Sequence, residues 1–239
     1  MSRALLTAKL GGVATRGEPS GFLAVLGHDL RGPIAILNGQ IQLMQRRLRR
    51  EADRALDLRD LGRIAYQVDR LHAHLDLVLD AARILDDRLD MNPVRGDLTA
   101  AVRRVVAAIE PGVTRHTIVV DLPAEGLVGT WDHTLIGRAL HAVVANAIRY
   151  SPRGGEVRVR AVRDGMMARL EVEDQGIGVP EADHDRIFEC WRRGANAEDG
   201  GGAGLGLFVA RAVVARHGGT LGFRPRPEGG TAFWITLPM

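Results

Sequence analysis

A histidine beside an acid gives this sequence its clearest reactive pair: His28 and Asp29, in the segment GHDLRGPIAIL of residues 27–37. A neutral imidazole is a nucleophile near pH 7. When one ring nitrogen attacks, a proton must leave the other, and the neighbouring Asp29 can accept that hydrogen bond and hold the tautomer. Gly32 and Pro33 follow and predict a looser or bent helix, because Pro33 cannot donate to the carbonyl of Asp29. On this segment alone, an exposed histidine without a function is the alternative.

The second half of the chain carries residue types that bind a metal ion and phosphate groups. Asn146, in HAVVANAIRYSP, offers a side-chain oxygen of the hard kind that suits Mg²⁺. Arg149 is three residues further on the same predicted helix and can reach phosphate. Residues 200–211, GGGAGLGLFVAR, run into another predicted helix, whose dipole and backbone amides favour phosphate. An unremarkable exposed asparagine and a merely flexible glycine loop are the alternatives.

Heptad patterns in the first ninety residues predict the helices that must hold His28. The second helix has apolar residues spaced three and four apart at Leu61, Ile64, Val68, Leu71, Leu75, Val78, Ala82 and Leu85. The first helix repeats this pattern, with one slip at Gly32-Pro33, at Leu23, Leu26, Leu30, Ile34, Leu37, Ile41, Met44 and Leu48. The pattern directs His28 to the outer face. One antiparallel pair cannot bury both seams, so we expect a homodimer that forms a four-helix bundle.

The remaining residues predict an α/β domain. Asp97 can cap a helix that reaches about Ile109, Asp132 can cap one that reaches Arg149, and a third helix is expected from about Leu205 to His217. Alternating apolar residues predict strands at 117–122, 156–162, 168–173, 220–224 and 231–237. This order fits a mixed sheet with helices on one face.

Composition excludes several classes of protein. The single cysteine, Cys190, cannot form an intramolecular disulfide and suits a reducing compartment. No apolar run approaches the roughly 18–20 residues that span a membrane, so we expect a soluble, cytoplasmic chain or the cytoplasmic part of a longer receptor. The arginine run at 46–50 has no aromatic residues beside it, which argues against nucleic-acid binding.

The segment HDLRGP resembles the H box of sensor histidine kinases, the autokinases of two-component systems. The resemblance implies that His28 is the phosphoacceptor, that Asp29 is the acid beside it and that Pro33 bends the helix. Gly32 departs from the family, which usually has Thr or Asn there. In relatives that side chain helps to position water for dephosphorylation of the partner protein, and glycine cannot do so.

Four further segments resemble the nucleotide-binding boxes of the same family, in the family's order. HAVVANAIRYSP resembles the N box, DQGIGVP and GGGAGLGLFVAR the two glycine boxes, and RIFECWRR the phenylalanine box. The resemblance implies that Asn146 holds Mg²⁺, that Tyr150 borders the adenine and that Asp174 accepts a hydrogen bond from its amino group. The other residues that it places at ATP are Arg149, Gly176, Gly178, Phe188, Arg192, Arg193, Gly202, Gly204, Leu205, Gly206, Leu207 and Thr231. For Phe188, simple packing is the alternative.

The resemblance covers residues 20–239 and implies three parts: a tail at 1–19, a dimerisation and histidine phosphotransfer hairpin at 20–90, and a catalytic ATP-binding domain at 91–239. The implied function is transfer of the ATP γ-phosphoryl group to His28 and then to an aspartate of a response regulator receiver domain. Related ATPases carry a glutamate base one helical turn before the metal-binding asparagine, where this chain has Ala142. Two alternatives remain: a nucleotide-binding dimeric scaffold or pseudokinase, and a serine kinase of the anti-sigma type.

Overall fold

The computed structural model describes residues 39, 41, 42, 58–192 and 204–239 of the chain. Residues 39, 41 and 42 are helical. The described residues do not include the rest of the first predicted helix or the predicted turn at 51–53. The hairpin and the four-helix bundle therefore stay predictions. Among the helices of the described part, none combines the length and apolar character needed to cross a membrane.

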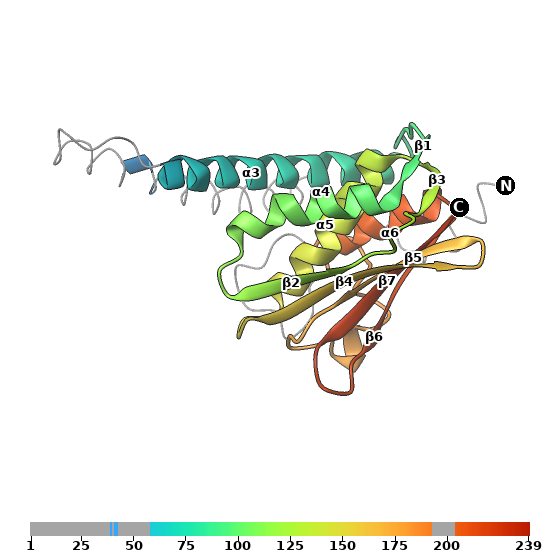
Figure 1. Cartoon of the computed structure of the whole chain (residues 1–239). Coiled ribbons are helices and arrows are strands. Elements are labelled where there is room, and N and C mark those ends of the chain that lie inside the picture. The colour runs from blue at the N-terminus through green and yellow to red at the C-terminus, as the bar shows by residue number, and fades with distance from the viewer. Residues whose placement is uncertain (1–38, 40, 43–57, 193–203) are drawn as a thin grey trace.

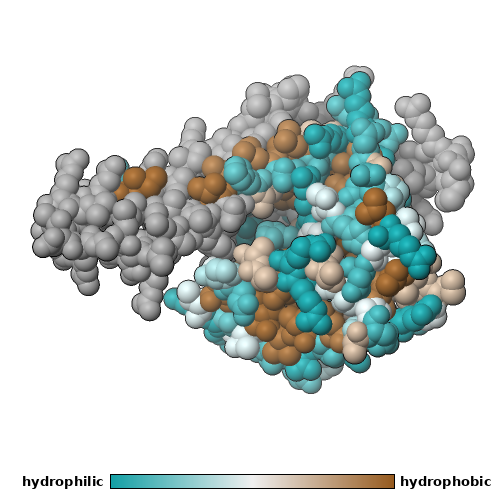
Figure 2. Space-filling view, turned by 45° about the horizontal axis from the view of Figure 1, so that its top comes forward, coloured by the Kyte–Doolittle hydropathy of each residue, from teal (hydrophilic) through white to brown (hydrophobic). Residues whose placement is uncertain are grey.

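The second predicted helix is confirmed as α3, Leu58–Leu85, a rod of 28 residues that extends beyond the helices beneath it (Figure 1). Its two long faces differ. Asp80 and Ala81 are fully buried against the helices of the α/β domain, whereas the predicted seam residues Leu75 and Leu85 are 39% and 53% exposed. Figure 2 shows hydrophobic patches along this extended part of the molecule. Leu75 and Leu85 thus remain accessible to other helices, whereas another seam residue, Val78, packs against the core of the domain.

A five-stranded mixed sheet forms one layer of the domain, in the order β2-β4-β5-β7-β6. Its strands are β2 His116–Asp121, β4 Gly155–Asp164, β5 Met167–Glu173, β6 Thr220–Pro225 and β7 Thr231–Pro238. The β2–β4 pair is parallel and the other neighbours are antiparallel. The last strand in sequence, β7, therefore lies inside the sheet rather than at its edge.

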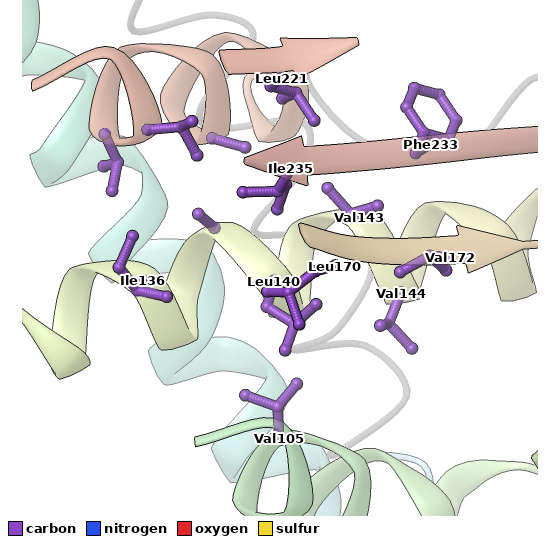
Figure 3. Packing of buried hydrophobic residues seen from close by; sticks show 14 of the residues in the cluster. Val105, Ile136, Leu140, Val143, Val144, Leu170, Val172, Leu221, Phe233 and Ile235 are labelled. Atoms are coloured by element: carbon purple, nitrogen blue, oxygen red, sulfur yellow. The ribbon is translucent and has the colours of Figure 1, made fainter. Parts of the chain in front are cut away.

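The helices α4 (Leu98–Ile109), α5 (His133–Arg149) and α6 (Gly206–Arg216) cover one face of this sheet, as predicted (Figure 1). The core lies between the two layers. In Figure 3, Leu140, Val143 and Val144 of α5 lie among Leu170, Val172 and Ile235 of the sheet, and Val105 of α4 approaches α5 from the other side. Strand residues alternate between faces, so every second side chain of β5 and β7 enters this core.

Both predicted caps are confirmed. Asp97 accepts hydrogen bonds from the backbone N–H and the hydroxyl of Thr99, at 2.9 Å and 2.7 Å, and Asp132 accepts from the N–H groups of Thr134 and Leu135, both at 3.0 Å. Burial raises the pKa of each carboxyl, but hydrogen bonds to the ionised form outweigh it and the net pKa is lowered. The caps therefore fix where α4 and α5 begin.

Two short strands were not predicted from the sequence. Strands β1 (Val94–Asp97) and β3 (Val128–Trp131) form a separate antiparallel ribbon. The ring of Trp131 lies across Gly129, where a Cβ would come 2.2 Å from it, and the indole N–H donates to the carbonyl of Pro238 at 2.8 Å. One-turn 3₁₀ helices also occur at Glu110–Gly112 (η1) and Glu181–Asp183 (η2).

Candidate nucleotide-binding site

Asp174 follows β5 and, at 3% exposure, is the most enclosed charged residue among the predicted site residues that the structure describes. Its Oδ1 accepts hydrogen bonds from the N–H groups of Gly176 at 2.8 Å and Thr231 at 3.2 Å. Burial raises the pKa of this carboxyl, and these hydrogen bonds together with the charge of Arg226 counter that rise only in part. One carboxylate oxygen is thus held by the backbone, and Oδ2 is left to accept from a ligand.

Gly176 brings the first glycine box against the end of α5. A Cβ at this position would lie 2.1 Å from the carbonyl oxygen of Tyr150 and 2.8 Å from Oγ of Ser151. The next residue, Ile177, donates its N–H to the Tyr150 carbonyl at 2.9 Å. Only glycine permits this approach, and it joins the segment after Asp174 to the helix that carries Asn146.

Asn146, Arg149 and Tyr150 occupy the last turn of α5 and the residue that follows it. Asn146 and Tyr150 are partly exposed and Arg149 is exposed, so ligands can reach this end of the helix. Within the described residues, no group of three or more His, Cys, Asp and Glu side chains is placed to hold a metal ion. A single amide oxygen still fits Mg²⁺, since this ion takes most of its ligands from phosphates and water at nucleotide sites.

The second glycine box leads directly into α6. Gly204 has φ +69°, in the left-handed region, and a Cβ there would lie 2.3 Å from the carbonyl oxygen of Arg192. Leu205 is 1% exposed and precedes the helix, while Gly206 and Leu207 form its first turn. No side chain caps this helix, so its first amides and its dipole remain for an anion.

The phenylalanine box is placed mainly by packing. The ring of Phe188 lies 6.1 Å from that of Phe223, and the guanidinium carbon of Arg211 is 5.2 Å from the Phe188 centroid. Burial raises the pKa of the Cys190 thiol to about 11, so this thiol is unreactive at neutral pH. These contacts favour the packing interpretation of Phe188.

Arg192 connects the phenylalanine box to the second glycine box. Its backbone contacts Gly204, and its Nε, buried and without a hydrogen-bond partner, is 3.6 Å from Oε2 of Glu189. The segment between these two contacts, residues 193–203, lies outside the described residues, and with it the predicted phosphate contacts Arg193 and Gly202. His28 and Asp29 lie outside them as well.

The structure thus brings together Asp174, Gly176 and Thr231, and links them to the end of α5. Two relationships were missed from the sequence. Nη1 of Arg226 donates to the carbonyl of Asp174 at 2.8 Å, across 52 residues of sequence. Ala142 faces Gly206, where an added Cβ would lie 3.5 Å from the alanine methyl. Neither contact has a sequence signal, because both depend on how distant segments pack.

Comparison with known proteins agrees with this geometry. Residues 131–239 match the family described as histidine kinase-, DNA gyrase B- and HSP90-like ATPases. The chain is 32% identical to the sensor protein KdpD of Escherichia coli over 228 residues, and 30% identical to the sensor-like histidine kinase SenX3 of Mycobacterium tuberculosis over 222 residues. The solved structure of the mycobacterial sensor histidine kinase MprB is 30% identical, covers 62% of this chain and 97% of that one, and has a TM-score of 0.55.

The chain belongs to the sensor histidine kinase family. The matches to KdpD and SenX3 each cover 91% of this chain, but only 24% and 53% of those longer proteins.

Two more distant structures share the fold of this kinase-family chain. ShkA in complex with AMPPNP is 23% identical with a TM-score of 0.60, and covers 93% of this chain and 46% of that one. Histidine kinase ThkA in complex with the response regulator TrrA is 22% identical with a TM-score of 0.59, and covers 99% of this chain and 64% of that one.

Proposed function

We propose that this chain is an ATP-dependent protein-histidine kinase of a two-component system. Asp174 carries the proposal, because its buried carboxylate has one oxygen fixed by two backbone N–H groups and the other left to accept. An acceptor in this position suits the 6-amino group of adenine. The match to the histidine kinase and gyrase ATPase family, and the AMPPNP bound to the related fold of ShkA, support ATP as the nucleotide.

We assign the phosphate contacts to the second glycine box and the end of α5. The first amides of α6, preceded by Gly204, would bind phosphate oxygens, as would Arg149. Asn146 would hold Mg²⁺, which when bound neutralises phosphate charge. Together these groups would orient the γ-phosphorus toward a nucleophile on the helical hairpin.

In the proposed reaction, a ring nitrogen of His28 attacks the γ-phosphorus. A nitrogen–phosphorus bond forms, the bond to the bridging oxygen breaks, and ADP leaves with that electron pair. Asp29 holds the proton of the other ring nitrogen. A carboxylate of a response regulator then attacks the phosphorus and releases the neutral imidazole. The complex of ThkA with TrrA supports this class of partner.

The hairpin of residues 20–90 would make the homodimer through its heptad seams. The exposed Leu75 and Leu85 on α3 support this assignment, since an apolar seam in water favours association. Use of ATP and of a response regulator would place this part of the protein in the cytoplasm.

Labelling with γ-labelled ATP tests the proposal. The wild-type chain should acquire acid-labile, alkali-stable label, and His28→Ala should lose it while still binding ADP. Wild-type protein that binds ATP but never becomes labelled would instead be the second candidate, a nucleotide-binding scaffold. The observation that favours this candidate is Ala142, whose methyl group packs toward Gly206 in place of a polar side chain.

A further inference from the structure

The turn between β6 and β7 places Arg226 against the backbone of Asp174. Nη1 of Arg226 donates to the Asp174 carbonyl at 2.8 Å, and the arginine side chain is only 19% exposed. Nη2 lies 3.3 Å from a carboxylate oxygen of Glu228 and 3.6 Å from one of Glu173. The backbone of Arg226 is fixed by hydrogen bonds with Gly229 and Gly230 at 3.1 Å and 3.2 Å.

The carbonyl that Arg226 binds has little freedom of its own. Gly230 approaches it so closely that a Cβ would lie 2.1 Å from the oxygen. The N–H of Asp174 donates to the carbonyl of Thr231 at 2.9 Å. The main chain of Asp174 is therefore held on both sides by the β6–β7 turn, and main-chain orientation determines where its carboxylate points.

This orientation matters because Oδ1 and Oδ2 have different environments. Oδ1 accepts from Gly176 and Thr231, whereas Oδ2 receives no hydrogen bond from the part of the chain that the structure describes. A hydrogen bond to a ligand at Oδ2 depends on the carboxylate remaining in this rotation. The charge of Arg226 also lowers the pKa of this carboxyl, whose burial favours the neutral form.

We propose that Arg226 is a positioning residue, which fixes the main chain of Asp174 so that Oδ2 accepts from the 6-amino group of a purine. The inference rests on the proposed function, because it takes the adenine of ATP as the ligand of Asp174. Arg226 contacts neither the base nor the reacting atoms. Its role is to give the site its preference for a purine that carries an amino group at position 6.

Nucleotide binding by Arg226→Gln tests this role, with two matched variants. Arg224→Gln removes the same charge from the same hairpin, but Arg224 pairs with Glu171 and Glu173 on the outer face of the sheet. Arg226→Lys keeps a donor and the charge. Dissociation constants are measured for ADP and for purine riboside 5′-diphosphate, which has hydrogen in place of the 6-amino group. ADP is used because it has no γ-phosphoryl group, so its binding is measured without phosphoryl transfer.

We expect Arg226→Gln to weaken ADP binding by about tenfold, the loss that one hydrogen bond to a charged group produces, with less than a twofold effect on the purine analogue. Arg226→Lys should recover most of the ADP affinity, and Arg224→Gln should match wild type. The pH at which ADP affinity is half lost should move upward in Arg226→Gln. Arg226 is the side chain whose charge acts on the Asp174 carboxyl. The groups paired with Arg226 are Glu173 and Glu228, whereas Arg224 pairs with Glu171 and Glu173.

Equal weakening of both nucleotides, or no change in either, overturns the positioning role while leaving the ATP site intact. A wild-type chain that binds neither nucleotide refutes the ATP site itself, and the role of Arg226 with it. A wild-type chain that binds both equally refutes the contact of Asp174 with the amino group. The midpoint of thermal unfolding, measured for each variant, separates these results from loss of folding.

Discussion

Arg138 on α5 donates to both carboxylate oxygens of Asp80 on α3, at 2.9 Å and 2.7 Å. Asp80 is completely buried, and Arg138 also lies 3.0 Å from Asp76, one turn earlier on α3. Arg138 and Asn146 are eight residues apart on α5, or about 12 Å along its axis. The helix that carries the proposed metal ligand is thus joined to α3, the second helix of the predicted hairpin, by an ion pair whose carboxylate is fully buried.

Arg138→Ala should release α3 from the domain. The substitution leaves the Asp80 carboxylate buried without its partner, which costs about 3–5 kcal/mol for a fully buried pair and less here, because Arg138 is 30% exposed. Hydrogen exchange should show α3 amides losing protection before those of the sheet. Arg83→Ala is the matched control: Arg83 lies 3.7 Å from Asp80 but is 55% exposed, and its loss should cost less than about 1 kcal/mol. Equal effects of both variants would contradict the assignment.

ADP affinity should fall on acidification at a higher pH than for a site with an ordinary aspartate. Burial raises the pKa of Asp174 above its unfolded value, and protonation removes the acceptor. The effect on the stability of the fold has the opposite sign. Because the pKa of Asp174 is raised in the native state, ionisation of this carboxyl costs free energy of folding, and that cost decreases as the pH falls through the native pKa. Asp174→Asn should remove both the pH dependence of ADP affinity and that of stability. The first is measured by ADP titrations and the second by urea unfolding, each compared with wild type across pH. Retention of the binding profile in Asp174→Asn would assign it to another group.

Two alanine substitutions in the second glycine box should have very different effects. Gly204→Ala places a Cβ 2.3 Å from the Arg192 carbonyl at a φ of +69°, so it should lower stability by at least about 1 kcal/mol and weaken ADP binding. Gly206→Ala meets only the Ala142 methyl at 3.5 Å, an ordinary contact in the first turn of a helix. It should keep or slightly raise the unfolding temperature. Calorimetry of both variants, with and without ADP, makes the comparison, and similar losses would show that the backbone at 204 is not specially constrained.

Gly32→Thr should raise the rate at which the chain dephosphorylates its response regulator. The family resemblance assigns water positioning to a Thr or Asn at this position, and glycine supplies no side chain. The unmodified chain should therefore autophosphorylate but show weak phosphatase activity. Release of phosphate from a phosphorylated regulator measures this directly. Robust release by the unmodified chain would show that residue 32 is not needed for it.

The sequence was informative wherever the signal is local. The caps at Asp97 and Asp132, the helix α3 and the five strands of the main sheet are confirmed, because capping, heptads and alternation involve residues close in the chain. The ribbon of β1 and β3 was missed: each strand has four residues and contains a glycine, and Gly129 is required by the ring of Trp131.

The candidate site shows the same contrast between residues with a signal in the sequence and residues revealed only by folded contacts. The resemblance to the family's motifs brought Asp174, Gly176, Asn146 and Gly204 into consideration, and the structure joins Asp174 and Gly176 to the end of α5. Arg226 and Arg138 were not singled out, although each forms an interaction that holds a functional segment in place. An arginine in a polar turn or on a helix surface has no distinguishing pattern, so only the folded contacts reveal it.

The position of β7 has a consequence for how the protein is made. Thr231–Pro238 pairs with β5 on one side and β6 on the other, and its first residue gives Asp174 an N–H. During synthesis, β5 and β6 therefore each have an unpaired edge until β7, which comes last in the sequence, has been made. Domains tend to fold as units and exposed edges promote aggregation. A nascent chain that ends before residue 231 lacks the strand between β5 and β6 and the N–H that Thr231 donates to Asp174, so neither the sheet nor the proposed nucleotide site can be complete.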